Sequence, residues 1–131
     1  MLKNEELTGR IIGAAITVHR ELGPGFLESI YEAALAIEFD HLDIKYERQK
    51  PVSISYRARP VGDHRLDFLV EGSVVVELKA VLNLEKVFFA ITRSYLKATR
   101  LETGLLLNFA SMPLTVKRIG SEDLEYLASH S

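Results

Sequence analysis

The stretch RLDFLVEGSVVVELKA, residues 65–80, decides the fold of this chain. Its two halves, residues 65–70 and 74–80, are rich in β-branched and aromatic side chains, which favour strands. The EGS segment between them is typical of a turn. The stretch therefore predicts a β-hairpin at the centre of the protein.

The register of this hairpin brings two acidic side chains together. If the loop has three residues, Val70 lies opposite Val74 and Asp67 lies opposite Glu77, with Cβ atoms ~4.5–5.5 Å apart. Two unpaired carboxylates repel each other at that distance, and a bound cation relieves the repulsion. Glu77 and Lys79 share one strand face. Two carboxylates beside an ammonium suit a small Mg²⁺-type site, in which the lysine positions or deprotonates a water. The alternative is a surface salt bridge between Lys79 and one of the carboxylates on a half-exposed hairpin.

Composition narrows the class of protein. The chain has 131 residues, of which 47% are hydrophobic, and this favours one domain over residues 1–131. The absence of cysteine excludes disulfides and thiolate metal ligands. The absence of cysteine, the acidic start of the chain and the lack of an apolar run of ~18–20 residues together predict a cytoplasmic protein without membrane spans.

The net charge of −2 gives no overall attraction to nucleic acid. Basic residues gather in the segments 45–65 and 86–100. They could form one basic surface that contacts phosphates, or they could lie on ordinary solvated faces of strands and helices.

Periodicity along the chain predicts a mixed sheet flanked by helices on both faces. The second helix is expected to turn Ile30, Ala33 or Ala34, and Ile37 inward. Asn4 and Asn83 are candidate N-caps for the first and third helices. The expected helices cover residues 4–22, 27–42, 83–99 and 121–128, and the expected strands cover 45–50, 52–57, 65–70, 74–80, 103–109 and 114–119, with a turn at 61–63.

The second helix carries a more specific pattern. In LGPGFLESIYE, residues 22–32, the positions Gly25, Glu28 and Tyr31 resemble the segment that names the GxxExxY family, which belongs with the PD-(D/E)xK nuclease-like proteins. Further stretches resemble that family in the same order along nearly the whole chain. The resemblance implies an α/β (α+β) class of fold, with a restriction-endonuclease-like mixed sheet.

The resemblance also implies roles for individual residues. Asp67 and Glu77 would be the principal ligands of Mg²⁺, with Mn²⁺ as a substitute. Glu28 would supply a further carboxylate from the helix, and the carbonyl of Leu78 could add one more oxygen. Lys79 would lie next to the attacking water.

Four other residues are candidates for substrate binding: Arg65, Tyr31, Tyr95 and Lys97. Tyr31 could orient the helix carboxylate, or it could lie in the core with its hydroxyl on a backbone group. The sequence departs from related nucleases at Ile91, where a glutamine is expected four residues before the tyrosine.

Two hypotheses follow. The first is a Mg²⁺-dependent nuclease that hydrolyses phosphodiester bonds in nucleic acid, with DNA as the expected substrate. The second is a non-catalytic nuclease-like scaffold that acts as a nucleic-acid or protein interaction module, in the form of a homodimer. Ile91 and the Phe88-Phe89 pair, which could widen an apolar surface, favour the second hypothesis. A phosphodiesterase for nucleotides is a third possibility.

Overall fold

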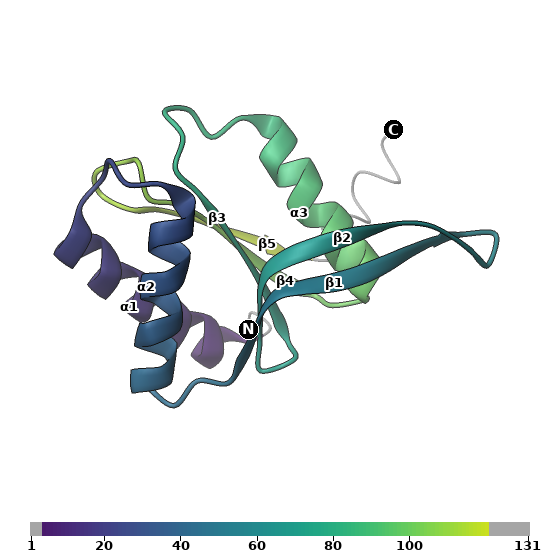
Figure 1. Cartoon of the computed structure of the whole chain (residues 1–131), viewed down its shortest axis with the longest axis horizontal. Helices are drawn as coiled ribbons and strands as arrows, with labels where there is room; N and C mark the ends of the chain where they lie inside the picture. The colour runs from purple at the N-terminus through teal and green to yellow at the C-terminus, as the bar shows by residue number, and fades with distance from the viewer. Residues whose placement is uncertain (1–3, 121–131) are drawn as a thin grey trace.

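The computed structural model describes residues 4–120, which form three helices and five strands (Figure 1). The helix expected at 121–128 lies outside the described residues. The elements are α1 (Glu5–Leu22), α2 (Glu28–His41), β1 (Tyr46–Tyr56), β2 (Arg59–Val70), β3 (Val74–Lys79), α3 (Lys86–Thr99), β4 (Thr103–Asn108) and β5 (Thr115–Gly120).

The five strands make one mixed sheet in the order β1-β2-β3-β4-β5. Only the β3–β4 pair is parallel, because α3 crosses between them; the other neighbouring pairs are antiparallel. Helices α1 and α2 cover one face of the sheet and α3 covers the other, so the described residues hold two apolar clusters, one on each side (Figure 1). The predicted α+β architecture with helices on both faces is confirmed.

The central hairpin has the predicted register. Val70 pairs with Val74 across the three-residue turn, and the backbone ladder between β2 and β3 continues for two more pairs. It stops there, and the next two positions of the same register are Asp67 and Glu77. The two acidic residues therefore lie at the point where the strands stop pairing through their backbones.

The other hairpin differs from expectation. Strand β1 runs without interruption through Pro51, and the turn expected at 61–63 lies inside β2. The chain reverses instead at Arg57 and Ala58, which both have positive φ. Because β1 is an edge strand, Pro51 can belong to it without costing the sheet a ladder hydrogen bond. The β1–β2 hairpin extends away from the body of the protein as an arm (Figure 1).

The inward face of α2 was predicted wrongly. Ile30 and Ile37 are exposed, whereas the buried side chains include Tyr31, Leu35 and Phe39. Apolar residues lie on more than one side of this helix, so periodicity alone offers two stripes of similar hydrophobicity. The aromatic side chains decide between them, because their rings pack against other rings of the core.

Neither predicted asparagine cap forms. Asn4 occupies the N-cap position of α1, but its side chain donates to Thr103 Oγ1 instead of to the helix end. Asn83 precedes α3, whose N-cap position is held by Glu85.

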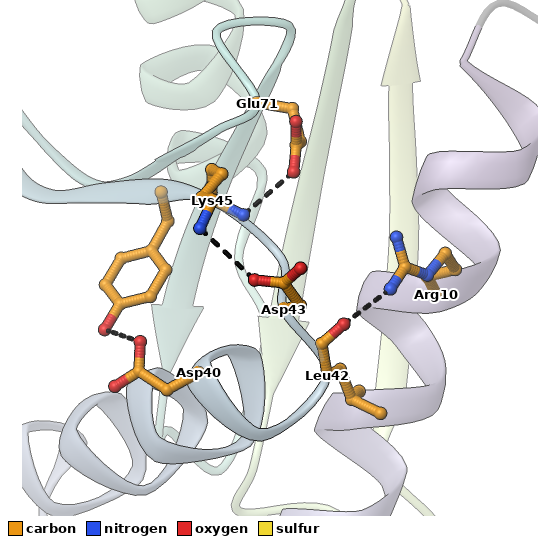
Figure 2. A network of polar contacts seen from close by, with 7 residues as sticks. Arg10, Asp40, Leu42, Asp43, Lys45 and Glu71 are labelled. Atoms are coloured by element: carbon orange, nitrogen blue, oxygen red, sulfur yellow. Dashed lines mark hydrogen bonds and ion pairs between the residues drawn. The ribbon is translucent and has the colours of Figure 1, made fainter.

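Polar contacts fasten the end of α2 to the strands that follow it (Figure 2). The Tyr46 hydroxyl donates to Asp40 at 2.8 Å, and the Lys45 amide donates to Glu71 in the β2–β3 turn at 2.8 Å. Further contacts join Lys45 Nζ to Asp43 and Arg10 to the carbonyl of Leu42. These bonds hold α2 in a set position relative to the central hairpin, and thereby position the carboxylates that α2 carries.

Candidate active site

Two carboxylates bridge the strands β2 and β3 where their backbone pairing ends. The amide of Asp67 donates to Glu77 Oε2 at 2.8 Å, and the amide of Leu78 donates to Asp67 Oδ2 at 2.8 Å. Each side chain thus accepts the hydrogen bond that a backbone carbonyl would accept in a regular ladder. The other oxygen of each carboxylate, Asp67 Oδ1 or Glu77 Oε1, accepts no backbone amide of the described residues and can meet a ligand.

Burial makes this pair of carboxylates electrostatically costly. Glu77 is only 5% exposed, and burial raises its pKa from 4.5 to about 9, with the charge of Asp67 adding to the rise. Burial also raises the pKa of Asp67. The amides that donate to the two side chains, and the charge of Lys79, lower both pKa values without cancelling the effect. A cation beside the pair would favour the ionised forms.

Lys79 lies close to the pair but does not form the surface salt bridge considered above. Its Nζ is 4.8 Å from the centre of the Phe88 ring on α3, and its side chain is half-buried. The buried Glu77 accepts the Asp67 amide instead. Stacking over an aromatic face holds the ammonium on the α3 side of the sheet.

Helix α2 directs two carboxylates toward Asp67. Glu28 is exposed, in the first turn of the helix, and Glu32 follows one turn later and is half-buried. Both charges raise the pKa of Asp67, and Glu32 has the larger effect. Glu32 also raises the pKa of Glu77. The sequence pattern indicated Glu28 alone as the helix carboxylate. Glu32 lies four residues after Glu28, and this i,i+4 spacing on a helix was the signal that could have added it.

Gln49 is a site residue that sequence reasoning missed. Its Nε2 donates to Glu32 Oε1 at 2.6 Å and lies 3.4 Å from Asp67 Oδ1, so this amide connects the helix carboxylate to the strand carboxylate. Gln49 falls opposite Asp67 in the β1–β2 register and has a φ of 50°. Position 91, where related nucleases were expected to carry glutamine, is isoleucine. An amide beside the carboxylates is supplied by β1 instead.

The strain in the backbone at Gln49 predicts a difference in the free energy of unfolding between two substitutions at this position. A β-carbon in the left-handed region costs ~1–2 kcal/mol, and glycine avoids most of that cost. Both Gln49→Gly and Gln49→Ala remove the side-chain bonds, but only glycine relieves the backbone. We expect Gln49→Gly to be more stable than Gln49→Ala by about 1 kcal/mol in urea unfolding. Equal stability, or a more stable alanine variant, would contradict a strained position 49.

Three of the candidate substrate-binding residues are accessible. Burial raises the pKa of Tyr95, which is half-buried, and the charges of Glu77 and Asp67 add to the rise. Arg65 is exposed and donates to the carbonyl of Gln49 at 3.2 Å. Lys97 is exposed, about half a turn further along α3 than Tyr95.

Tyr31, the fourth candidate, lies in the core. It is fully buried, and its hydroxyl donates to the Gly23 carbonyl at 2.6 Å and accepts from the Phe26 amide at 3.1 Å. Of the two alternatives weighed for this tyrosine, these contacts match the core position with the hydroxyl on backbone groups. Tyr31 fastens the loop between α1 and α2, and its side chain does not reach the surface where a substrate would bind.

Tyr31→Phe should therefore affect stability more than the site. Losing the hydroxyl leaves a carbonyl and an amide of the loop without their partner, which typically costs about 1–3 kcal/mol. Thermal unfolding should show that loss, while any activity of the site should stay within about twofold of the wild type at a temperature where the variant is folded. A large fall in rate for the folded variant would give Tyr31 a role beyond the loop.

No group of three or more His, Cys, Asp and Glu side chains within residues 4–120 is already gathered as a metal site. The site consists of one close pair of carboxylates, Asp67 and Glu77, and the carboxylates on α2 raise the pKa values of this pair through their charges. Glu28 is exposed and raises the pKa of Asp67 through its charge, whereas Glu32 accepts a hydrogen bond from Gln49 and pairs with Arg48 at 2.9 Å.

None of the described helices is long and apolar enough to cross a membrane.

A mixed sheet flanked by helices, with two acidic residues and a lysine at diverging central strands, defines a nuclease-like α+β class of protein. The chain belongs to the PD-(D/E)XK nuclease superfamily, because the model of that family matches residues 5–119. Nucleases of this superfamily generally use divalent metal ions. Comparisons with curated proteins and with solved structures gave no match.

Proposed function

We propose that this protein is a metal-dependent nuclease that hydrolyses phosphodiester bonds in DNA, with Mg²⁺ as its metal and Mn²⁺ as a substitute. One observation carries the proposal. Asp67 and Glu77 are bridged to each other's strands by backbone amides, and they lie together with Glu77 buried and Asp67 half-buried, although burial and the repulsion between them disfavour the charge of Glu77. Such an arrangement is costly for a structural role and suits a site that receives a cation.

The residues present fit a hard divalent cation. Asp67 Oδ1 and Glu77 Oε1 are the carboxylate oxygens left for it, and Glu28 and the Leu78 carbonyl are candidates for further ligands. Oxygen donors of this kind match Mg²⁺ and Mn²⁺. A bound divalent cation supplies polarisation of a phosphoryl oxygen and lowers the pKa of a coordinated water.

The remaining residues would bind the substrate and move a proton. Lys79, held over Phe88 beside the carboxylates, would orient the attacking water and offset negative charge on the phosphoryl group in the transition state. Arg65 would contact a phosphate, and Tyr95 would contact the sugar or base next to the scissile bond. Gln49 would keep Asp67 Oδ1 and Glu32 in a fixed orientation.

A cleavage assay tests this function. The wild-type protein is incubated with duplex DNA, single-stranded DNA, RNA and a small phosphodiester, in EDTA, Mg²⁺ or Mn²⁺. We expect cleavage of DNA in Mg²⁺ and in Mn²⁺, and none in EDTA. Cleavage of the small ester alone would point to a nucleotide phosphodiesterase. Calorimetry that finds no metal binding at millimolar concentration, together with intact DNA in every buffer, would favour the non-catalytic module and its homodimer.

A further inference from the structure

A polar groove lies between the β1–β2 arm and α3. It has a volume of about 550 Å³, within the usual range for ligand sites. Its lining includes three hydroxyls, an imidazole and two cationic side chains, supplied by Ser53, Ser55, His64, Ser94, Lys97 and Arg100. Of these residues only Lys97 was selected from the sequence, since the groove exists only where the arm folds over the end of α3.

One hydrogen bond defines the proton arrangement of His64. Ser94 Oγ lies 2.6 Å from the carbonyl of Ile91 and 3.2 Å from His64 Nε2. A carbonyl can only accept, so the single hydroxyl proton of Ser94 goes to Ile91 and the proton of the longer contact comes from Nε2. His64 therefore carries its hydrogen on Nε2 and is held in one orientation.

The cations of the groove are not neutralised by ion pairs. Lys97 and Arg100 are exposed and form no ion pair with a carboxylate of residues 4–120. Elsewhere the structure pairs several basic side chains with acids, such as Arg48 with Glu32 at 2.9 Å. A groove with two unneutralised cations and several hydroxyls matches a phosphate group.

Arg100 occupies a backbone position that ordinarily belongs to glycine. It follows the last residue of α3 with a φ of 60°, and its amide bonds back to the Leu96 carbonyl to end the helix. Glycine is the usual residue there, because a β-carbon in this region is strained. The chain bears that strain at a residue that lines the groove and brings a cationic side chain to it.

The groove adjoins the carboxylate site. The His64 ring packs edge-on against Tyr95, with ring centres 4.4 Å apart, and Asp67 and Glu77 both act on Tyr95. His64 precedes Asp67 by three residues on β2, which corresponds to about 10 Å of strand. One strand of nucleic acid advances about 3.4 Å per phosphate along a helix axis, and its phosphates lie further apart than that along the backbone, so the groove lies at most about three nucleotides from the carboxylates.

We propose that this groove binds a backbone phosphate of the substrate strand, within about three nucleotides of the bond that is cut. Lys97 and Arg100 supply the charge, and the hydroxyls of Ser53 and Ser55 supply further donors to the phosphate oxygens. The inference rests on the proposed function, because it makes the groove part of the nuclease site and predicts a minimum substrate length on one side of the scissile bond.

The test compares a groove variant with a matched surface variant. The groove variant is Lys97→Ala with Arg100→Gly, where glycine removes the guanidinium and suits the backbone. The control is Lys117→Ala with Arg20→Ala, which removes the same two charges from exposed positions on β5 and α1. The dissociation constant of a fluorescent single-stranded oligonucleotide is measured in EDTA, so that no metal-dependent cleavage interferes. Substrates of about 15 and about 3 nucleotides are used.

We expect the groove variant to bind the long oligonucleotide at least about tenfold more weakly than the wild type, and the control less than about threefold. The slope of log affinity against log salt should become shallower by about 0.7 for the groove variant, as expected when one phosphate contact is lost from a single strand. The short oligonucleotide should bind the wild type and the groove variant equally. Equal losses in groove and control variants, or equal losses with both lengths, would overturn the proposal.

Two further outcomes separate this inference from the proposed function. If the groove variant loses affinity but no metal supports cleavage by the wild type, the nuclease proposal fails and the binding groove stands. If the wild type cleaves DNA but the groove variant binds normally, only the groove proposal fails. Displacement of the long oligonucleotide by a millimolar nucleoside monophosphate would also overturn it, since the groove would then bind free nucleotides.

Discussion

Lys79→Ala and Asp67→Asn should each lower the rate of DNA cleavage by at least about 10²-fold. The reasons differ. Asp67→Asn removes the charge of a proposed metal ligand, whereas Lys79→Ala removes the ammonium proposed to lie beside the attacking water and leaves the carboxylates in place. Calorimetry with Mg²⁺ should therefore find weak or absent binding for Asp67→Asn and near-normal binding for Lys79→Ala.

The control for this pair is Lys117→Ala, which removes a lysine charge from an exposed position on β5. Its rate should stay within about threefold of the wild type. Rates unchanged by both site substitutions would refute the proposed mechanism. Loss of metal binding in Lys79→Ala as well would show that the lysine supports the fold of the site instead of the chemistry.

Glu77→Gln should make the metal-free protein more stable at alkaline pH, which is unusual for a substitution in a buried site. The pKa of Glu77 is about 9 in the folded protein against an ordinary value of 4.5. Between those values the folded state binds the proton more tightly than the unfolded state, so the stability of the wild type falls as pH rises. Glutamine cannot ionise, and its oxygen can still accept the Asp67 amide.

The expected gain is about 2–4 kcal/mol at pH 8 in EDTA, and it should vanish below about pH 4, where Glu77 is largely protonated in both states. Urea unfolding at several pH values measures it, with the exposed Glu21→Gln as control. Millimolar Mg²⁺ should raise the melting temperature of the wild type but not of Glu77→Gln. A variant that is less stable than the wild type at pH 8 would show that the carboxylate is not electrostatically strained.

The candidate site lowers the stability of the folded protein. Buried carboxylates, the left-handed backbone of Gln49 and the left-handed Arg100 are each unfavourable for a purely structural protein. All three lie at the carboxylate pair or at the groove beside it. Strained and electrostatically unfavourable positions commonly gather at functional sites, where a ligand or substrate offsets the cost.

Much of the fold could be predicted from short-range patterns. The alternation around Asp67 and Glu77, with a three-residue turn between the strands, was enough to define the register of the central hairpin and the pairing of its acidic residues. The buried run of β4 and the mixed sheet with helices on both faces could be predicted in the same way. The inward face of α2 could not, because Ile30 and Ile37 match a helical stripe as well as Tyr31 and Phe39 do.

The amino-acid sequence by itself determined the strands, their central register and the chemical identity of Asp67, Glu77 and Lys79, since these depend on residues close together in the chain. Only the tertiary structure decided that Gln49 and Glu32 join the carboxylates, and that the arm and α3 enclose a basic groove. Those contacts join residues from different elements. They depend on how the long β1–β2 hairpin extends beside α3 and on how α2 is fastened to the strands that follow it, and no local pattern of side chains encodes either arrangement.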